Sequence, residues 1–145
     1  MNHMQTIELK LLADVSADKI WTTLADFGGF LNWAGDGSGS IQIEGEGVGM
    51  IRHLEMAAGK IAERLTTLDP NNHQIGYEIV YGQPIGMKTY QALVTVTSTG
   101  EGTCSINWRG RFSPVVAGTE KQVGETLRTT FHHMNQALVA YAQNN

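Results

Sequence analysis

The chain has 145 residues, of which 41% are hydrophobic and 17% charged, and its formal net charge is −4. These values are typical of a soluble globular protein, and residues 1–145 are expected to form one domain. The negative charge and the scattered Lys and Arg residues argue against a nucleic-acid partner. The single cysteine, Cys104, excludes an internal disulfide and a cysteine-rich zinc site.

The sequence predicts neither a membrane-spanning segment nor a secretory signal. No apolar run approaches the roughly 20 residues that span a bilayer. Residues 1–10 also lack the apolar stretch of a secretory signal. We therefore expect a cytoplasmic protein without a membrane span.

The first part of the chain predicts one strand and two short helices. Residues 6–14 alternate apolar and polar side chains, which is typical of a half-buried strand. A helix is expected to begin after Ser16, whose hydroxyl can cap it, and to run to about Asp26. Gly28 and Gly29 then permit a sharp turn into a short second helix that carries aromatic side chains.

The middle of the chain predicts an antiparallel sheet. Short joints, several of them marked by glycine or proline, separate successive strand-like segments, and this favours hairpins. The six candidates are residues 40–47, 49–56, 60–68, 73–81, 89–98 and 103–112. Together with the first strand they give seven strands.

The last part of the chain predicts one long helix over residues 119–141. Apolar residues recur every three or four positions from Val123 to Tyr141 and form one stripe. Thr119 and Gln122, three positions apart, match a capping box. Such a helix extends over about 35 Å, long enough to lie along the whole sheet. Helices that are segregated from an antiparallel sheet indicate the α+β class.

Five segments carry a family pattern: "SADKIWTTLADFGGFLNW", "GEGVGMIRHLE", "AERLTTLDPNNHQIGYEIV", "TYQALVTV" and "CSINWRGRFSP". In this order they resemble the START/Bet v 1-like (SRPBCC) superfamily, and most of all its polyketide cyclase/dehydrase and lipid-transport proteins. They are also similar to the plant abscisic acid receptors. The resemblance implies a helix-grip fold, in which a curved sheet wraps around the C-terminal helix and leaves a ligand cavity between them. It implies no universal catalytic motif.

The alternation of side chains along the strands selects residues that would face this cavity. Arg52 and Leu54 lie on the mostly apolar face of residues 49–56, and Glu63 lies on that of residues 60–68. A turn at residues 57–59 would place Leu54 roughly opposite Glu63, so Arg52 and Glu63 are expected to be diagonal neighbours. A buried charge is costly unless it is paired, and these two charges are within reach of each other. They form either a structural ion pair or a polar anchor for a ligand. The resemblance to the plant receptors, whose corresponding glutamate faces the cavity, favours Glu63 as an anchor.

Aromatic and apolar residues of the other elements complete the expected lining. Tyrosine and tryptophan combine a large apolar surface with a polar tip, which suits a pocket for a partly polar molecule. The further candidates are Trp33, Tyr77, Ile79, Tyr81, Tyr90, Trp108, Phe112, Phe131 and Met134.

No motif indicates a cofactor or a metal ion. The segment "GEGVG" lies between two expected strands and opens no helix, so it is interpreted as a turn rather than a dinucleotide loop. His132 and His133 would diverge by about 100° on a helix, which does not suit one metal ion. We expect neither a cofactor nor a metal site.

Three functions remain open from the sequence. The preferred hypothesis is binding or transport of a small hydrophobic or aromatic molecule, lipid- or polyketide-like, because no catalytic constellation is evident. The second is a cyclase or dehydratase in which Glu63 acts as general acid or base and Arg52 or a tyrosine orients a carbonyl. The third is a protein-interaction or assembly factor. No pattern in the sequence identifies the ligand or the oligomeric state.

Overall fold

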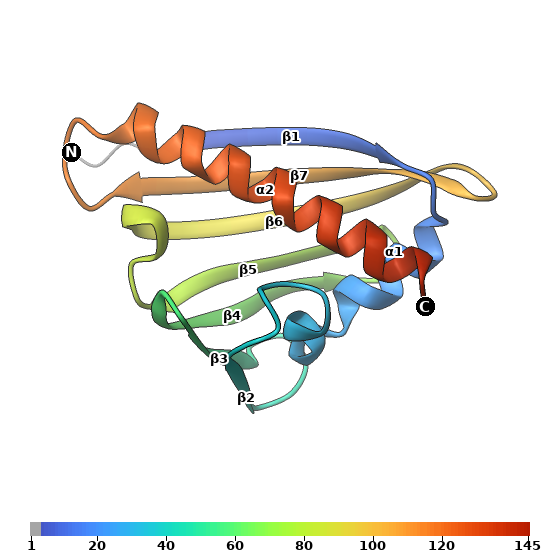
Figure 1. The fold of residues 1–145 in the computed structure, drawn as a ribbon, viewed down its shortest axis with the longest axis horizontal. Helices are drawn as coiled ribbons and strands as arrows, with labels where there is room; N and C mark the ends of the chain where they lie inside the picture. The colour runs from blue at the N-terminus through green and yellow to red at the C-terminus, as the bar shows by residue number, and fades with distance from the viewer. Residues whose placement is uncertain (1–3) are drawn as a thin grey trace.

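The computed structural model describes residues 4–145 as a seven-stranded antiparallel sheet with a long helix across one face (Figure 1). The strands lie in the order β1-β7-β6-β5-β4-β3-β2. The elements are β1 (Gln5–Ala13), α1 (Ala17–Ala25), η1 (Phe27–Asn32), β2 (Ser40–Glu44), β3 (Ile51–Met56), β4 (Gly59–Asp69), β5 (Gln74–Tyr81), η2 (Pro84–Gly86), β6 (Met87–Gly100), β7 (Thr103–Pro114) and α2 (Glu120–Gln143). The predicted α+β class, the seven strands and the two helical segments after the first strand are confirmed.

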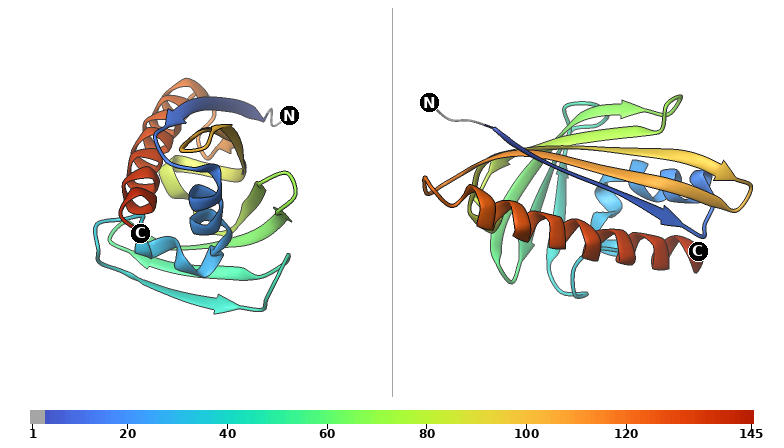
Figure 2. Two further views of the ribbon diagram at one scale, coloured as in Figure 1. Left: turned by 90° about the vertical axis from the view of Figure 1, so that its right-hand side faces the viewer. Right: turned by 90° about the horizontal axis from the view of Figure 1, so that it is seen from above.

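The sheet curves, and the helices occupy its concave side (Figure 2). The helix α2 lies along β1 and β7, and α1 packs beside α2 near the C-terminal end of that helix. The short helix η1 contacts the edge strand β2. The elements α1, η1 and α2 therefore meet at one end of the sheet. Within residues 4–145, no helix is both long and apolar enough to cross a membrane.

The core lies between α2 and the central strands. The predicted stripe of α2 faces it, with Leu127, Phe131 and Leu138 fully buried. Burial of each such side chain contributes about 1.5–3 kcal/mol. Gly110 on β7 allows the helix to come this close, because a Cβ built there would lie 2.8 Å from Phe131 Cζ. The helix and the sheet are thus in direct contact over this region.

The two α-helices begin differently from one another. Ser16 caps α1 as predicted, since its Oγ accepts a hydrogen bond from the Lys19 backbone N–H at 3.2 Å. The capping box predicted for α2 is wrong. The Thr119 hydroxyl instead donates to the Val116 carbonyl oxygen at 2.7 Å, so it does not cap the first turn.

The turn between α1 and η1 is located at Asp26, not at the two glycines. Asp26 has φ −77° and ψ 79°, which takes the chain out of the helix. Gly28 and Gly29 lie inside η1, and neither has a positive φ. Gly28 serves a packing need instead, because a Cβ there would lie 3.2 Å from Ile43 Cγ1 on β2. The prediction of a glycine turn was therefore wrong in its location.

Candidate ligand-binding site

A buried ion pair lies on the inner face of the sheet. Arg52 on β3 is directly opposite Glu63 on β4, and its Nε donates to Glu63 Oε1 at 2.8 Å. Their side chains are only 5% and 7% exposed. The prediction that both face inward and interact is supported by this contact, but the predicted diagonal register was wrong. The turn is shorter than expected, since Met56 pairs with Gly59 and only residues 57–58 connect the strands.

Aromatic rings of η1 surround the guanidinium group of Arg52. The Arg52 Cζ lies 3.9 Å from the ring centroid of Phe27 and 4.2 Å from that of Phe30. Its Nη1 also donates to the Phe27 carbonyl oxygen at 3.2 Å. Each cation–π contact of this kind contributes about 0.5–2 kcal/mol. Arg52 thus holds η1 against the sheet, and the aromatic residues after α1 gather around a buried cation.

Two buried tyrosines extend this cluster. The ring of Tyr77 on β5 lies 5.0 Å from the Arg52 Cζ and packs edge to face on Tyr90 of β6, with centroids 6.0 Å apart. Burial, together with the Glu63 carboxylate, raises the pKa of Tyr77 to about 12. Burial and the neighbouring Tyr77 raise the pKa of Tyr90 well above its usual value. Both phenols are therefore neutral at neutral pH and are able to donate hydrogen bonds.

A second polar contact joins the sheet to α2. The Trp108 indole N–H donates to Asn135 Oδ1 at 3.0 Å, and the Trp108 ring packs on Phe131 with centroids 5.6 Å apart. Asn135 is buried and was missed from the sequence. Its position gave a signal, because it follows Phe131 by four residues and precedes Leu138 by three, which places it within the apolar stripe.

A small inner cavity lies between these groups. Its volume is about 20 Å³, which is room for roughly one water molecule. The space between these groups is thus nearly filled by the protein's own side chains. The cavity is lined by Leu24, Asp26, Phe27, Phe30, Trp33, Arg52, Ile75, Tyr77, Val94, Trp108 and Met134.

The predicted lining residues fall into three groups. Those that border the inner cavity are Trp33, Arg52, Tyr77, Trp108 and Met134. A second group does not border the cavity but contacts residues that do, and it consists of Glu63, Tyr90 and Phe131. Those that pack elsewhere in the interior are Leu54, Ile79 and Phe112.

Tyr81 does not face the interior, and its prediction as a lining residue was wrong. Tyr81 is 64% exposed to solvent. A bulge interrupts the pairing of β4 with β5: Glu63 is opposite Ile79, whereas the preceding Ala62 is opposite Tyr81. Val80 is therefore an extra residue on β5, and it reverses the face of the residue that follows.

Phe27 and Phe30 are the principal lining residues that the sequence analysis did not select. They lie three positions apart in a 3₁₀ helix, where residues at i and i+3 lie on the same side. Both rings consequently lie over Arg52. The spacing of three was visible in the sequence, and a short aromatic helix was expected there, but its two phenylalanines were not selected as lining residues.

The histidines of the described chain do not form a metal site. Over residues 4–145, no three or more His, Cys, Asp or Glu side chains gather as metal ligands would. His53 instead approaches an exposed carboxylate, with its Nε2 3.0 Å from Glu44 Oε1. His73 stacks on Trp21, with ring centroids 5.2 Å apart.

Solved structures with the same fold include enzymes and a protein named Ara h 8.0201. A norcoclaurine synthase variant from Thalictrum flavum, bound to a transition-state analogue, has a TM-score of 0.78 at 20% identity, covering 99% of this chain and 97% of that one. The Zhui aromatase/cyclase from a Streptomyces species has a TM-score of 0.73 at 19% identity, covering 97% and 92%. Ara h 8.0201 has a TM-score of 0.80 at 17% identity, covering 99% and 100%. At these identities the similarity establishes the fold alone.

The family is established by the sequence over nearly its whole length. A comparison with curated proteins gives no match. A family model described as polyketide cyclase/dehydrase and lipid transport matches residues 4–143. This range includes the ion pair, the tyrosines and the whole of α2. The chain therefore belongs to the polyketide cyclase/dehydrase and lipid-transport family.

Proposed function

We propose that the chain binds a small, largely apolar molecule at the inner cavity, with Arg52 as its polar anchor. The observation that carries this proposal is the position of the Arg52–Glu63 pair, nearly excluded from water beside the cavity. A buried ion pair stabilises a fold no better than well-packed apolar residues would. Recognition of a ligand gives a charged pair at this place a use beyond its structural contacts with η1.

The groups around the cavity define the chemistry of the ligand. A guanidinium carries five N–H donors, and the hydrogen bonds to Glu63 and Phe27 engage two of its nitrogens. The neutral hydroxyl of Tyr77 is a further donor at the same cavity. Apolar and aromatic side chains form most of the remaining wall. We therefore infer an aromatic or polycyclic ligand with at least one oxygen that accepts hydrogen bonds.

Binding requires the cavity to enlarge. The inner cavity of about 20 Å³ is far below the ~300–1,000 Å³ of typical small-molecule pockets. Met134 on α2 and the aromatic residues of η1 border it and are the groups that a ligand would displace. The thioether chain of methionine adapts readily to new shapes. The proposal thus couples ligand binding to a movement of η1 or α2.

A competition experiment tests the anchor. Aminoanthracene should bind the protein saturably and gain fluorescence, and acetylnaphthalene should displace it better than ethylnaphthalene, which has the same rings without a carbonyl. Arg52→Met should abolish this preference. Arg111→Met, which removes an exposed arginine of β7, is the matched control and should keep it. Equal displacement by the two compounds in the wild type would contradict the proposal.

A second candidate function is a cyclase or dehydratase reaction at the same place. Its support is the proximity of Glu63 to two neutral buried phenols, which together offer a base and two proton donors. Glu63 would then act as general acid or base on a ligand that Arg52 orients. Glu63→Gln should abolish turnover of a polyketide-like substrate while leaving acetylnaphthalene binding in place.

For both candidate functions we propose a cytoplasmic protein without a nucleic-acid partner, on the grounds of the sequence.

A further inference from the structure

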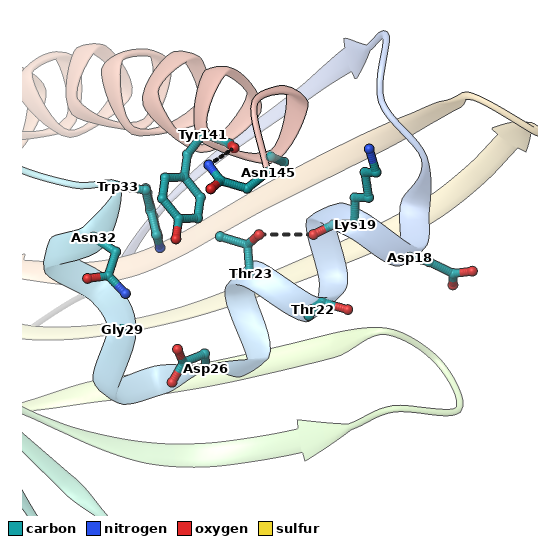
Figure 3. Close-up of a pocket in the computed structure, with 11 residues that line it drawn as sticks. Asp18, Lys19, Thr22, Thr23, Asp26, Gly29, Asn32, Trp33, Tyr141 and Asn145 are labelled. Atoms are coloured by element: carbon teal, nitrogen blue, oxygen red, sulfur yellow. Dashed lines mark hydrogen bonds between the residues drawn. The ribbon is translucent and has the colours of Figure 1, made fainter.

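A second, larger pocket opens at the surface where α1, η1 and the C-terminal end of α2 meet (Figure 3). This outer pocket has a volume of about 350 Å³. The side chains of Trp33 and Tyr141 lie next to each other in it, whereas those of Asp18 and Lys19 point away (Figure 3). Its lining consists of Asp18, Lys19, Thr22, Thr23, Asp26, Gly29, Asn32, Trp33, Tyr141, Ala142 and Asn145.

The outer pocket and the inner cavity share a wall. Trp33 and Asp26 line both of them. The Trp33 ring packs edge to face on Phe30, with centroids 5.1 Å apart, and Phe30 in turn covers the Arg52 guanidinium. The barrier between the outer pocket and the buried cation is therefore η1 itself, with Trp33 at its end. Trp33 lines both spaces, so its displacement would open this barrier at the end of η1.

The backbone after Trp33 permits such a displacement. Trp33 is the C-cap of η1 and is only partly buried. The exposed loop that follows contains Gly35 and Gly37, whose φ values are 88° and 87°. Glycine adopts this region without strain and also leaves it readily. The end of η1 is thus followed, after the buried Ala34, by an exposed segment in which glycine allows the chain more than one path.

We propose that the outer pocket is the outer half of one ligand site and that Trp33 is the gate between the halves. This inference rests on the proposed function. The apolar rings of the ligand occupy the enlarged inner cavity beside Arg52, and its other end lies in the outer pocket. The gate explains how so small an inner cavity admits a ligand.

The outer pocket selects a ligand end that donates hydrogen bonds. The Thr23 hydroxyl donates its proton to the Lys19 carbonyl oxygen at 3.0 Å, so its oxygen remains available only as an acceptor. The Asp26 carboxylate is a second acceptor in the same wall. A hydroxyl group on the ligand can donate its proton to either of them. The ligand class is therefore a polycyclic molecule with a hydroxyl at the end opposite its acceptor oxygen.

Two probes test the selection. Naphthaleneethanol and ethylnaphthalene share their rings and differ by one hydroxyl group. Thr23→Val should weaken naphthaleneethanol binding about fivefold in calorimetric titration, because one hydrogen bond is lost, and should leave ethylnaphthalene unchanged. Thr130→Val on α2 is the matched control, since Thr130 makes the same backbone hydrogen bond, to Thr126 at 2.9 Å, and borders neither pocket.

Stopped-flow kinetics test the gate. Trp33→Ala should raise both the association and the dissociation rate constants of naphthaleneethanol by about tenfold, because the closed wall is gone. Trp33→Phe should raise them less. Trp21→Ala is the matched control: Trp21 is also partly buried, stacks on His73 and borders neither pocket, so its loss should leave both rate constants unchanged.

The outcomes separate this inference from the proposed function. If the wild type binds the probes but both Trp33 variants, folded by their melting curves, leave the two rate constants unchanged, the gate is wrong and the proposed function stands. If Thr23→Val weakens the binding of naphthaleneethanol and of ethylnaphthalene equally, the selection of a hydroxyl is wrong. If neither these probes nor aminoanthracene bind the wild type, the proposed function itself fails.

Discussion

Arg52 and Glu63 are direct cross-strand partners, and 2.8 Å separates Arg52 Nε from Glu63 Oε1, with both side chains almost inaccessible to solvent. Each charge therefore depends on the other for compensation. The aromatic rings that cover Arg52 keep water from replacing a lost partner.

Removal of one partner of this pair should be more harmful than removal of both. Arg52→Met should lower the free energy of unfolding by about 3–5 kcal/mol, because Glu63 is left buried and uncompensated. The double variant Arg52→Met/Glu63→Leu should recover a large part of this loss in urea denaturation. The half-exposed pair Arg64 and Glu78 is the control, and its removal should cost less than about 1 kcal/mol. Simple additivity of the two core substitutions would contradict the account.

The buried tyrosines should make the protein sensitive to alkali. The pKa of Tyr77 is raised from 10.0 to about 12, so above pH 10 the unfolded chain loses this proton while the folded chain keeps it. The contribution of the neutral phenol to stability is therefore complete below pH 10 and is lost as the pH rises towards about 12. The urea midpoint of the wild type should fall across this pH range, and the midpoint of Tyr77→Phe should fall less steeply. Parallel curves for the two proteins would rule out this role of Tyr77.

Gly110 should tolerate no side chain. Gly110→Ala places a methyl group 2.8 Å from Phe131 Cζ, between the sheet and α2. Such overpacking should destabilise the protein by about 1–3 kcal/mol in thermal unfolding. Gly102→Ala is the control, because a Cβ there meets nothing within 4 Å. The close approach of α2 is refuted if both variants melt alike.

Tyr81 and Tyr77 should differ in their effect on binding although both belong to β5. Tyr81→Ala removes an exposed side chain of the opposite face and should leave the affinity for acetylnaphthalene unchanged. Tyr77→Phe removes a donor at the inner cavity and should weaken that affinity about fivefold. Calorimetric titration measures both. A larger effect of the Tyr81 substitution would place the binding site outside the interior.

The elements of the fold were predictable because each has a strong local periodicity. Residues such as Trp108 and Phe112 alternate with exposed arginines along β7, and the stripe of α2 repeats over more than five turns. These patterns arise from burial of one face and need no knowledge of distant contacts. The inward orientation of Arg52 and Glu63 was predictable for the same reason.

The remaining features depend on contacts between segments or on local irregularities. The bulge that turns Tyr81 outward is a mismatch between two strands, and alternation along one strand does not reveal it. The stacking of Phe27 and Phe30 on Arg52 depends on a 3₁₀ helix and on a residue 25 positions away in sequence from Phe27. The near-closure of the inner cavity depends on how side chains from several elements fill one space. No single segment encodes its volume.

The measurement that tests the central claim most directly compares native and denaturing mass spectra of the protein, purified gently from its own host. The account predicts a native mass that exceeds the chain by a small molecule, which is released on denaturation and carries an aromatic ring system with oxygen substituents. Arg52→Met should lose this excess mass, while Arg111→Met should retain it. A bare native mass, together with the absence of saturable aminoanthracene binding, would contradict the account.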